Sequence, residues 1–409
     1  MSRRRVVVTG VGLMSPIGNS YDEVAQSLRY GRHGIRYMSE WDGFGHLATR
    51  VAAPVAEIPD APLNRKRMRT MGRVSVLALH ATAQALGDAG LSADYVSSSG
   101  VGLAYGSTHG STAETENFCR KVFGSNSFAG VPASSYLKFM SHTCASNLAA
   151  YYGIHGRIIT TCSACVSSSQ AIGFGYEAVR SGVQETMICG GAEELHVTHA
   201  GVFDVMFATS RKYNAMPAQT PRPFDVARDG LVVGEGAATV ILEPLERARA
   251  RGAKIYAEVL GFGTNSDGTT VTSPSANGTA GALRAALEDA RLAPESIDYV
   301  NAHGTATELG DIAESEATRA VLGEKVPISS TKSYTGHTLG ACGGLEAIFC
   351  FAMMEQGFVA PTRNLERVDP RCAPLNHVIG DPRELKVDTV MSNNFAFGGI
   401  NTSLIFGRV

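Results

Sequence analysis

Apolar residues follow the same succession of helical and strand periods in both halves of the chain. In the first half, their spacing predicts a helix over residues 74–89 and a strand over 101–105 that ends in glycine and hydroxyl residues. In the second half, it predicts a helix over 281–290 and a strand over 297–300 that runs towards His303. The two helices end in related tetrapeptides, Asp88-Ala89-Gly90-Leu91 and Asp289-Ala290-Arg291-Leu292.

The repetition continues further along each half. A β-branched strand at 158–161 breaks at Cys165 into a helix, and a strand at 326–330 passes through a glycine-containing loop into a helix from about 339 to 353. Strands that alternate with helices favour buried and largely parallel sheets. The sequence therefore predicts an α/β protein of two pseudo-symmetric halves, residues 1–250 and residues 251–409.

Composition narrows the class of protein without indicating a reaction. Apolar residues make up 44% of the chain and charged residues 18%, so a large core is expected. The net charge of −2 gives no indication of binding to nucleic acid or to an anionic membrane. No apolar run is long enough to span a membrane, and the short one after Arg5 is interpreted as a first buried strand. We expect a cytoplasmic protein whose eight cysteines are reduced.

Cys165 is the first candidate for chemistry. It lies among small residues at the junction of a strand and a helix. The free N–H groups and the dipole of a helix N-terminus lower the pKa of a thiol, which predicts a reactive nucleophile. Cys162 and Cys165 also form a C-x-x-C pair, for which dithiol redox chemistry and zinc binding are alternatives, although no further pair of ligands lies near.

His303 and His337 follow strands at equivalent places in the two halves. Ligands gather at the carboxyl ends of strands in α/β sheets, so we expect both histidines beside Cys165. The segment between Glu193 and His199 contains two more histidines, but no third ligand is apparent, and it is interpreted as a polar helix or loop without metal.

Taken together, these motifs resemble the β-ketoacyl-[acyl-carrier-protein] synthases, the thiolase-fold condensing enzymes of bacterial dissociated fatty acid and polyketide synthesis. The similarity extends over essentially the whole chain. It is carried by Val8-Thr9-Gly10-Val11-Gly12, Ser163-Ala164-Cys165, Gly190-Gly191-Ala192-Glu193-Glu194, Arg222-Pro223-Phe224-Asp225, Arg228-Asp229-Gly230, Val233-Gly234-Glu235-Gly236-Ala237, Asn301-Ala302-His303-Gly304-Thr305-Ala306-Thr307, Thr331-Lys332-Ser333-Tyr334-Thr335-Gly336-His337 and Phe395-Ala396-Phe397-Gly398-Gly399.

The resemblance implies five layers, α-β-α-β-α, and a dimer formed by pairing of sheet edges. It also implies an acyltransferase in which Cys165 takes the acyl group. His303 and His337 would then donate hydrogen bonds to a malonyl thioester as it loses CO₂. Lys332 would hold the two histidines and set their charge, and Glu346 would lie behind them, in contact with water or backbone.

The remaining roles implied by the resemblance concern the substrates. The N–H groups of Cys165 and Phe397 would form an oxyanion hole, Thr305 and Thr307 would bind the phosphopantetheine arm, and Phe395 would gate the acyl pocket with Phe397. No permanently bound cofactor is implied, because the substrates arrive on the phosphopantetheine of acyl carrier protein. This acidic partner would dock on two basic patches, Arg65, Lys66 and Arg69 in the first and Arg211 and Lys212 in the second.

His109 departs from the family pattern, which usually has isoleucine or glycine at this wall of the acyl chamber. The histidine predicts a more polar or shorter chamber, and hence an unsaturated or conjugated acyl chain. A thiolase is disfavoured because no second cysteine lies beside Phe397. We expect a homodimer, and an obligate heterodimer of a specialised polyene or polyketide pathway is the alternative.

Overall fold

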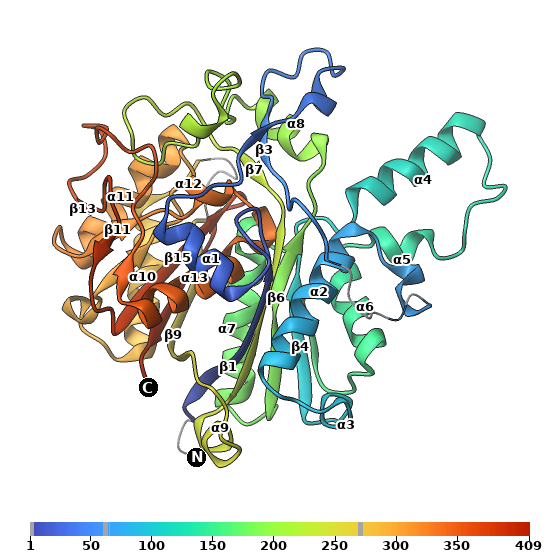
Figure 1. Cartoon of the computed structure of the whole chain (residues 1–409), viewed down its shortest axis with the longest axis horizontal. Coiled ribbons are helices and arrows are strands. Elements are labelled where there is room, and N and C mark those ends of the chain that lie inside the picture. Colours follow the sequence, from blue (N-terminus) through green and yellow to red (C-terminus); the bar gives the residue numbers. More distant parts are fainter. Residues whose placement is uncertain (1–3, 60–63, 65, 269–272) are drawn as a thin grey trace.

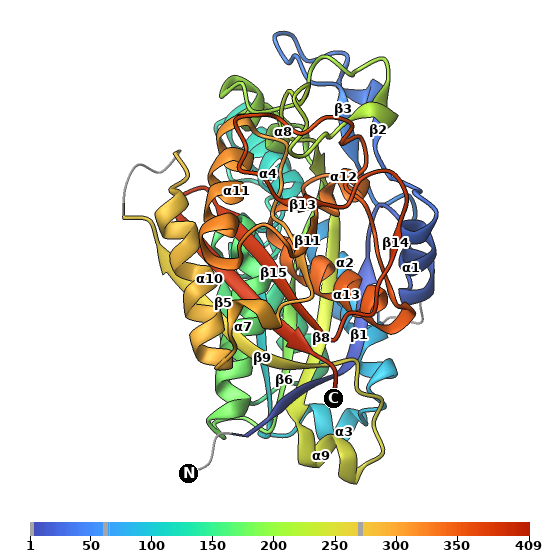
Figure 2. The same cartoon turned by 90° about the vertical axis from the view of Figure 1, so that its left-hand side faces the viewer.

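The computed structural model describes residues 4–59, 64, 66–268 and 273–409. Eleven strands form one hydrogen-bonded sheet, whose two halves have helices on both faces (Figures 1 and 2). In spatial order the strands are β13 (Asn376–His377), β11 (Pro327–Ser329), β10 (Tyr299–Asn301), β15 (Thr389–Ala396), β16 (Ile400–Gly407), β9 (Ala257–Ser266), β1 (Val6–Met14), β8 (Gly236–Pro244), β6 (Thr186–Glu193), β4 (Val101–Gly106) and β5 (Ile158–Thr161).

The other elements surround this sheet. The helices are α1 (Tyr21–Arg29), α2 (Arg73–Asp88), α3 (Ala93–Val96), α4 (Thr112–Ser125), α5 (Ser135–Phe139), α6 (Thr143–Tyr152), α7 (Ser167–Arg180), α8 (Val197–Val205), α9 (Leu245–Ala250), α10 (Ala276–Ala290), α11 (Glu308–Leu322), α12 (Lys332–Thr335) and α13 (Cys342–Gln356). Two small sheets contain β2 (Arg36–Tyr37), β3 (Val51–Ala53) and β7 (Val233–Gly234), and β12 (Phe358–Val359) and β14 (Arg383–Glu384).

Five layers pack against one another through three apolar clusters. The first lies around α7 and α13, which occupy the middle of the molecule between the two halves of the sheet (Figure 1). The second lies between α2, α6 and the strands of the first half, and the third lies between α10, α11 and the strands of the second half. The layer order is therefore helix, sheet, helix, sheet, helix.

The expectation of largely parallel sheets is wrong for the centre of the sheet. Parallel pairing joins β4 to β5 and β6, and β10 to β11 and β15. The central strands β8, β1, β9 and β16 pair antiparallel with one another, because β16 returns from β15 through a short turn and β8 runs back beside β6. Alternation of strands and helices along the sequence cannot reveal this reversal.

Glycines bring one helix close to the sheet in each half. A Cβ added at Gly12 of β1 would lie 2.0 Å from the carbonyl oxygen of Ala81 in α2. A Cβ added at Gly263 of β9 would lie 2.2 Å from the carbonyl oxygen of Ala282 in α10. The same close approach therefore occurs in both halves, and only glycine allows it.

The repeated tetrapeptides end these two helices and bind the neighbouring strand. Asp88 at the end of α2 accepts a hydrogen bond from the Val11 N–H at 2.9 Å. Asp289 at the end of α10 accepts one from the Phe262 N–H at 3.2 Å. The internal repeat predicted from the sequence thus corresponds to a repeated strand and helix contact.

The structure also bears on the environment of the chain. No helix in the described part of the chain has the length and apolar character needed to cross a membrane. All eight cysteines have free thiols.

Candidate active site

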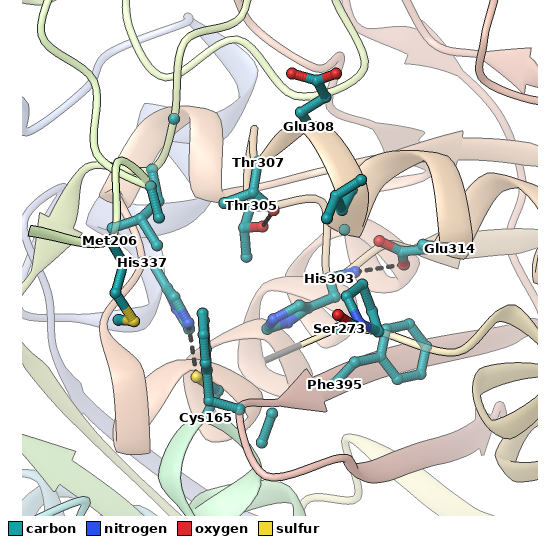
Figure 3. Close-up of a pocket in the computed structure, with 18 of the residues that line it drawn as sticks. Cys165, Met206, Ser273, His303, Thr305, Thr307, Glu308, Glu314, His337 and Phe395 are labelled. Carbon is teal, nitrogen blue, oxygen red and sulfur yellow. Dashed lines mark hydrogen bonds between the residues drawn. The ribbon is translucent and has the colours of Figure 1, made fainter. Parts of the chain in front are cut away.

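A cavity of about 680 Å³ opens where strands of both halves end. Its wall brings together Cys165, His303 and His337, which lie far apart in the sequence (Figure 3). His303 lies in the loop that follows β10, and His337 lies just after α12, the short helix that follows β11.

The chain turns sharply just before Cys165. Ala164 has φ of +49°, a left-handed conformation that L-residues seldom adopt, and begins a short 3₁₀ helix that leads into α7. The second half repeats this turn, because Leu339 has φ of +47° and begins the 3₁₀ helix that leads into α13. The turn places Cys165 at the head of a central helix with its thiol against the cavity.

Burial dominates the ionisation of Cys165. It raises the pKa of the thiol to about 11, while the charge of Lys332 and the backbone N–H groups of Phe397 and Cys165 act in the opposite direction. The lowered pKa expected from a helix N-terminus alone is therefore wrong, because the thiol is only 2% exposed. The resting sulfur is a neutral thiol.

The two imidazoles lie close to this sulfur on the cavity wall. His337 Nε2 lies 3.0 Å from Cys165 Sγ. The His303 and His337 rings meet edge to face, with centroids 5.2 Å apart. One donor atom of each of the three residues lies within 4.8 Å of the others, so a single reacting group fits against all three.

Both histidines are neutral. Burial lowers the pKa of His303 and of His337 well below the usual value, and the charge of Lys332 lowers both further. A neutral imidazole has one N–H to donate, and the tautomer decides which nitrogen carries it.

Backbone hydrogen bonds fix both histidine loops. Glu314 on α11 accepts a hydrogen bond from the His303 N–H at 2.7 Å (Figure 3). It accepts a second one from the Gly304 N–H, also at 2.7 Å. The His337 N–H donates to the Val232 carbonyl at 2.7 Å. The imidazoles are thus held through their own main chain.

Lys332 and Glu346 form an ion pair that is almost completely buried. Glu346 also accepts a hydrogen bond from the Asn394 amide at 2.7 Å. Burial opposes the charge of Lys332, but Glu346 raises the pKa of Lys332 overall, so the ammonium persists. The expected contact of Glu346 with water or backbone is replaced by these two side chains, and Lys332 influences the histidines through its charge.

The residues expected to bind substrate line the same cavity. Phe397 is exposed at the turn between β15 and β16, and its N–H points to Cys165. The hydroxyls of Thr305 and Thr307 lie 2.9 Å apart. Phe395 is half-buried beside His303, with ring centroids 5.8 Å apart.

Comparison with known proteins identifies the family. The model of the β-ketoacyl synthase N-terminal domain matches residues 3–248, and the model of the β-ketoacyl synthase C-terminal domain matches residues 256–366. The chain belongs to the β-ketoacyl synthase family. It is an acyltransferase of the condensing type.

Curated and solved relatives cover the whole chain. The 3-oxoacyl-[acyl-carrier-protein] synthase 1 of Haemophilus influenzae is 40% identical, with 99% of each chain covered. A β-ketoacyl synthase of Burkholderia phymatum is 51% identical with a TM-score of 0.96, covering 99% of this chain and all of that one. The ishigamide ketosynthase/chain length factor is 33% identical with a TM-score of 0.91, and all of each chain is covered. The predicted thiolase-like α/β fold is confirmed.

The two basic patches of this β-ketoacyl synthase differ in whether their side chains form ion pairs within the chain. Lys66, Arg69 and Lys212 are exposed, and none forms an ion pair within the described ranges. Arg211 instead forms an ion pair with the buried Asp204 at 3.0 Å, so it anchors the loop after α8. Arg65 lies outside the described residues.

His109 does not line the cavity that contains Cys165. Its ring stacks on that of His199, with centroids 5.4 Å apart and an interplanar angle of 15°. Burial lowers the pKa of His109. The sequence shows neither this stacking nor a third ligand near His199, because 89 intervening residues separate the two histidines.

Sequence analysis missed Glu314 and Asn394. Both are buried polar residues that contact catalytic candidates or their loops. A weak signal for Glu314 is the pair Asp311 and Glu314, two acids one helical turn apart on a helix face with few other charged residues.

Proposed function

We propose that this protein catalyses the decarboxylative Claisen condensation of malonyl-acyl carrier protein with an acyl group held on Cys165. The products are 3-oxoacyl-acyl carrier protein and CO₂. The observation that supports this proposal is the meeting of one thiol and two neutral imidazoles on a single cavity wall. The names of the curated relatives describe the same reaction class.

In the first step, Cys165 takes the acyl group from its carrier. The sulfur attacks the thioester carbonyl, a new C–S bond forms, the C–S bond to pantetheine breaks, and the thiol proton passes to the leaving pantetheine sulfur. The N–H groups of Cys165 and Phe397 are the proposed donors to the oxyanion. Positive charge on Lys332 and the nearby His337 Nε2 favour the transient thiolate.

In the second step, malonyl thioester enters along Thr305 and Thr307, whose hydroxyls are proposed to hydrogen-bond the pantetheine arm. The carboxylate leaves as CO₂, and its electron pair becomes the enolate of the remaining thioester. His303 and His337 are proposed to donate to the enolate oxygen. Neutral donors suit this task, because an already protonated imidazole would pair with the malonyl carboxylate and oppose its loss.

In the third step, the enolate carbon attacks the acyl thioester on Cys165. A carbon–carbon bond forms, the C–S bond to Cys165 breaks, and the sulfur is reprotonated. Phe395, half-buried beside His303, is the proposed gate between the cavity and the acyl chain. No permanently bound cofactor takes part in this sequence.

Exposed basic residues and an exposed sheet edge indicate the partners of this protein. We propose that an acidic acyl carrier protein docks near the cavity on Lys66, Arg69 and Lys212, with the loop anchored by Arg211. A homodimer is proposed through β5, which is one of the two edge strands of the sheet and exposes Ile158. The eight free thiols support a cytoplasmic location.

A specialised pathway is the second candidate. One solved relative is a ketosynthase with a chain length factor. The departure of His109 from the family pattern is the sequence feature that suggests an unusual acyl chain, but its ring lies outside the cavity that contains Cys165. The ketosynthase/chain length factor relative therefore supports a heterodimer as the alternative, and an unsaturated or conjugated acyl chain rests on the sequence at position 109 alone.

Intact-mass spectrometry tests the proposal. The protein is incubated with an acyl-carrier protein thioester and then with malonyl-carrier protein, and Cys165→Ala is the matched control. We expect a mass gain of one acyl group on the wild type only, followed by its loss and the appearance of 3-oxoacyl-carrier protein. Absence of acylation with every chain, also after addition of a chain length factor, would refute the role of Cys165. Comparison of saturated and polyenoyl thioesters tests the specialised pathway.

A further inference from the structure

Three potential metal ligands meet at a second place, outside the cavity that contains Cys165. They are His109 in the loop between β4 and α4, Glu193 at the end of β6, and His199 on α8. One donor atom of each lies within 4.8 Å of the others. None of the three lines the cavity of the candidate active site.

One carboxylate oxygen of Glu193 has no hydrogen-bond partner among the described residues. Its Oε2 accepts hydrogen bonds from the N–H groups of Thr108 at 2.9 Å and Gly340 at 3.1 Å, and from the Thr108 hydroxyl. Its Oε1 is buried and has no hydrogen-bond partner among the described residues. The side chain is wholly buried, and a buried carboxylate oxygen without a partner is costly unless a proton or a cation satisfies it.

The two histidines are oriented and neutral. The Thr112 hydroxyl lies 2.8 Å from His199 Nε2, and the Thr108 hydroxyl lies 3.1 Å from His109 Nδ1. Burial, together with the neighbouring His109 and His196, lowers the pKa of His199 to about 3. Neutral imidazole is the form that binds metal ions.

We propose that His109, Glu193 and His199 form a binding site for a divalent transition metal ion, with Zn²⁺ as the expected ion. Two imidazole nitrogens and one carboxylate oxygen are a donor set that zinc accepts, and a fourth position stays open for water. Ligands about 2.1 Å from zinc lie roughly 3.4 Å apart in a tetrahedron. In the structure, the donor atoms of the three residues lie within 4.8 Å of one another, and His109 is the exposed member.

The ion would join three segments that the main chain keeps separate. It would cross-link the loop before α4, the end of β6 and α8, which converge beside the catalytic region. Glu193 also holds Gly340, three residues after His337, so the site is connected to the loop of a catalytic histidine. Zinc at this site is therefore expected to stabilise the folded chain.

The test must separate this site from the catalytic one, because Cys165, His303 and His337 also lie close enough together to bind a metal. Tag-free full-length Cys165→Ala removes that thiolate ligand and serves as the parent protein. After dialysis against a chelator, it is titrated with Zn²⁺ by calorimetry and with Co²⁺ by visible absorption. We expect one ion per chain, Co²⁺ d–d bands without a thiolate charge-transfer band, and a melting temperature that rises with zinc concentration.

Variants of the parent assign the ligands. His109→Ala and Glu193→Gln should abolish the binding, and Thr112→Val should weaken it roughly 10- to 100-fold through loss of an outer contact to His199. His196→Ala is the matched control, since His196 contacts the His199 ring but pairs with Glu116, and it should bind normally.

Three results would overturn the proposal. They are no saturable binding by the parent, equal binding by the His109→Ala variant, and loss of binding only in the His196→Ala variant. Because His109 is exposed, its alanine variant is expected to stay folded, and circular dichroism of each variant checks this.

Discussion

The ionisation of Cys165 distinguishes two accounts of its reactivity. Its place at the start of a helix would lower the pKa of the thiol, whereas burial raises it to about 11 from an ordinary value of 9.0. Two pKa units reduce the thiolate population at neutral pH about a hundredfold. We expect iodoacetamide to alkylate Cys165 slowly at pH 7, at a rate that rises about tenfold per pH unit up to pH 10.

His337 contributes to the same equilibrium. Its Nε2 lies 3.0 Å from the sulfur, and a hydrogen bond to an ionised group contributes about 1.5–3 kcal/mol. His337→Ala is therefore expected to slow alkylation at a fixed pH by about tenfold or more. His303→Ala is the matched control, since His303 makes no hydrogen bond to Cys165 within the described part of the chain, and its rate should stay near that of the wild type.

Intact mass and peptide mapping provide the assay. The exposed Cys162 also reacts with iodoacetamide, so all proteins carry Cys162→Ser. A rate that levels off below pH 8 would refute the reasoning, because it would mean that the helix N-terminus outweighs burial. Equal slowing by both histidine variants would refute the specific role of His337.

Three further outcomes are expected from the buried and exposed charges and from one close contact. Lys332→Met leaves Glu346 charged and unpaired, so it should cost about 3–5 kcal/mol of unfolding free energy, and Lys332→Met with Glu346→Leu should recover much of this in urea denaturation. Equal urea midpoints for the two proteins would contradict this reasoning. Lys212→Glu should raise the KM for acyl carrier protein at low salt without changing kcat, and an unchanged KM would exclude Lys212 from docking. Gly106→Ala places a Cβ 1.9 Å from the Thr161 carbonyl oxygen and should lower the melting temperature of the protein. Calorimetry of the variant and the wild type measures the difference, and equal melting temperatures would contradict this prediction.

Local signals in the sequence locate the candidate reacting groups. The strand predicted at 158–161 is observed as β5 with the same bounds, and Cys165 follows it at the head of α7. His303 and His337 follow β10 and β11 as the strand ends predict. These features could be predicted because each depends on a few adjacent residues with a strand or helix period.

Contacts between distant segments could not be predicted in this way. The ion pair of Lys332 and Glu346, and the stacking of His109 on His199, depend on how loops converge in space. The high pKa of Cys165 depends on the depth of burial, which no local pattern reports. The antiparallel centre of the sheet similarly depends on where β8 and β16 return.

The central position of β1 has a consequence for synthesis of the chain on the ribosome. All nine residues of Val6–Met14 are buried, and both neighbours of this strand, β8 and β9, are encoded more than 200 residues later. At about 5–20 residues per second, roughly 10–50 s pass between translation of the strand and translation of its first partner. During that time an apolar segment emerges without a place in the sheet. The nascent chain is therefore a natural client for chaperones that bind apolar segments near the tunnel exit, and stalling of translation before residue 236 should leave it aggregation-prone.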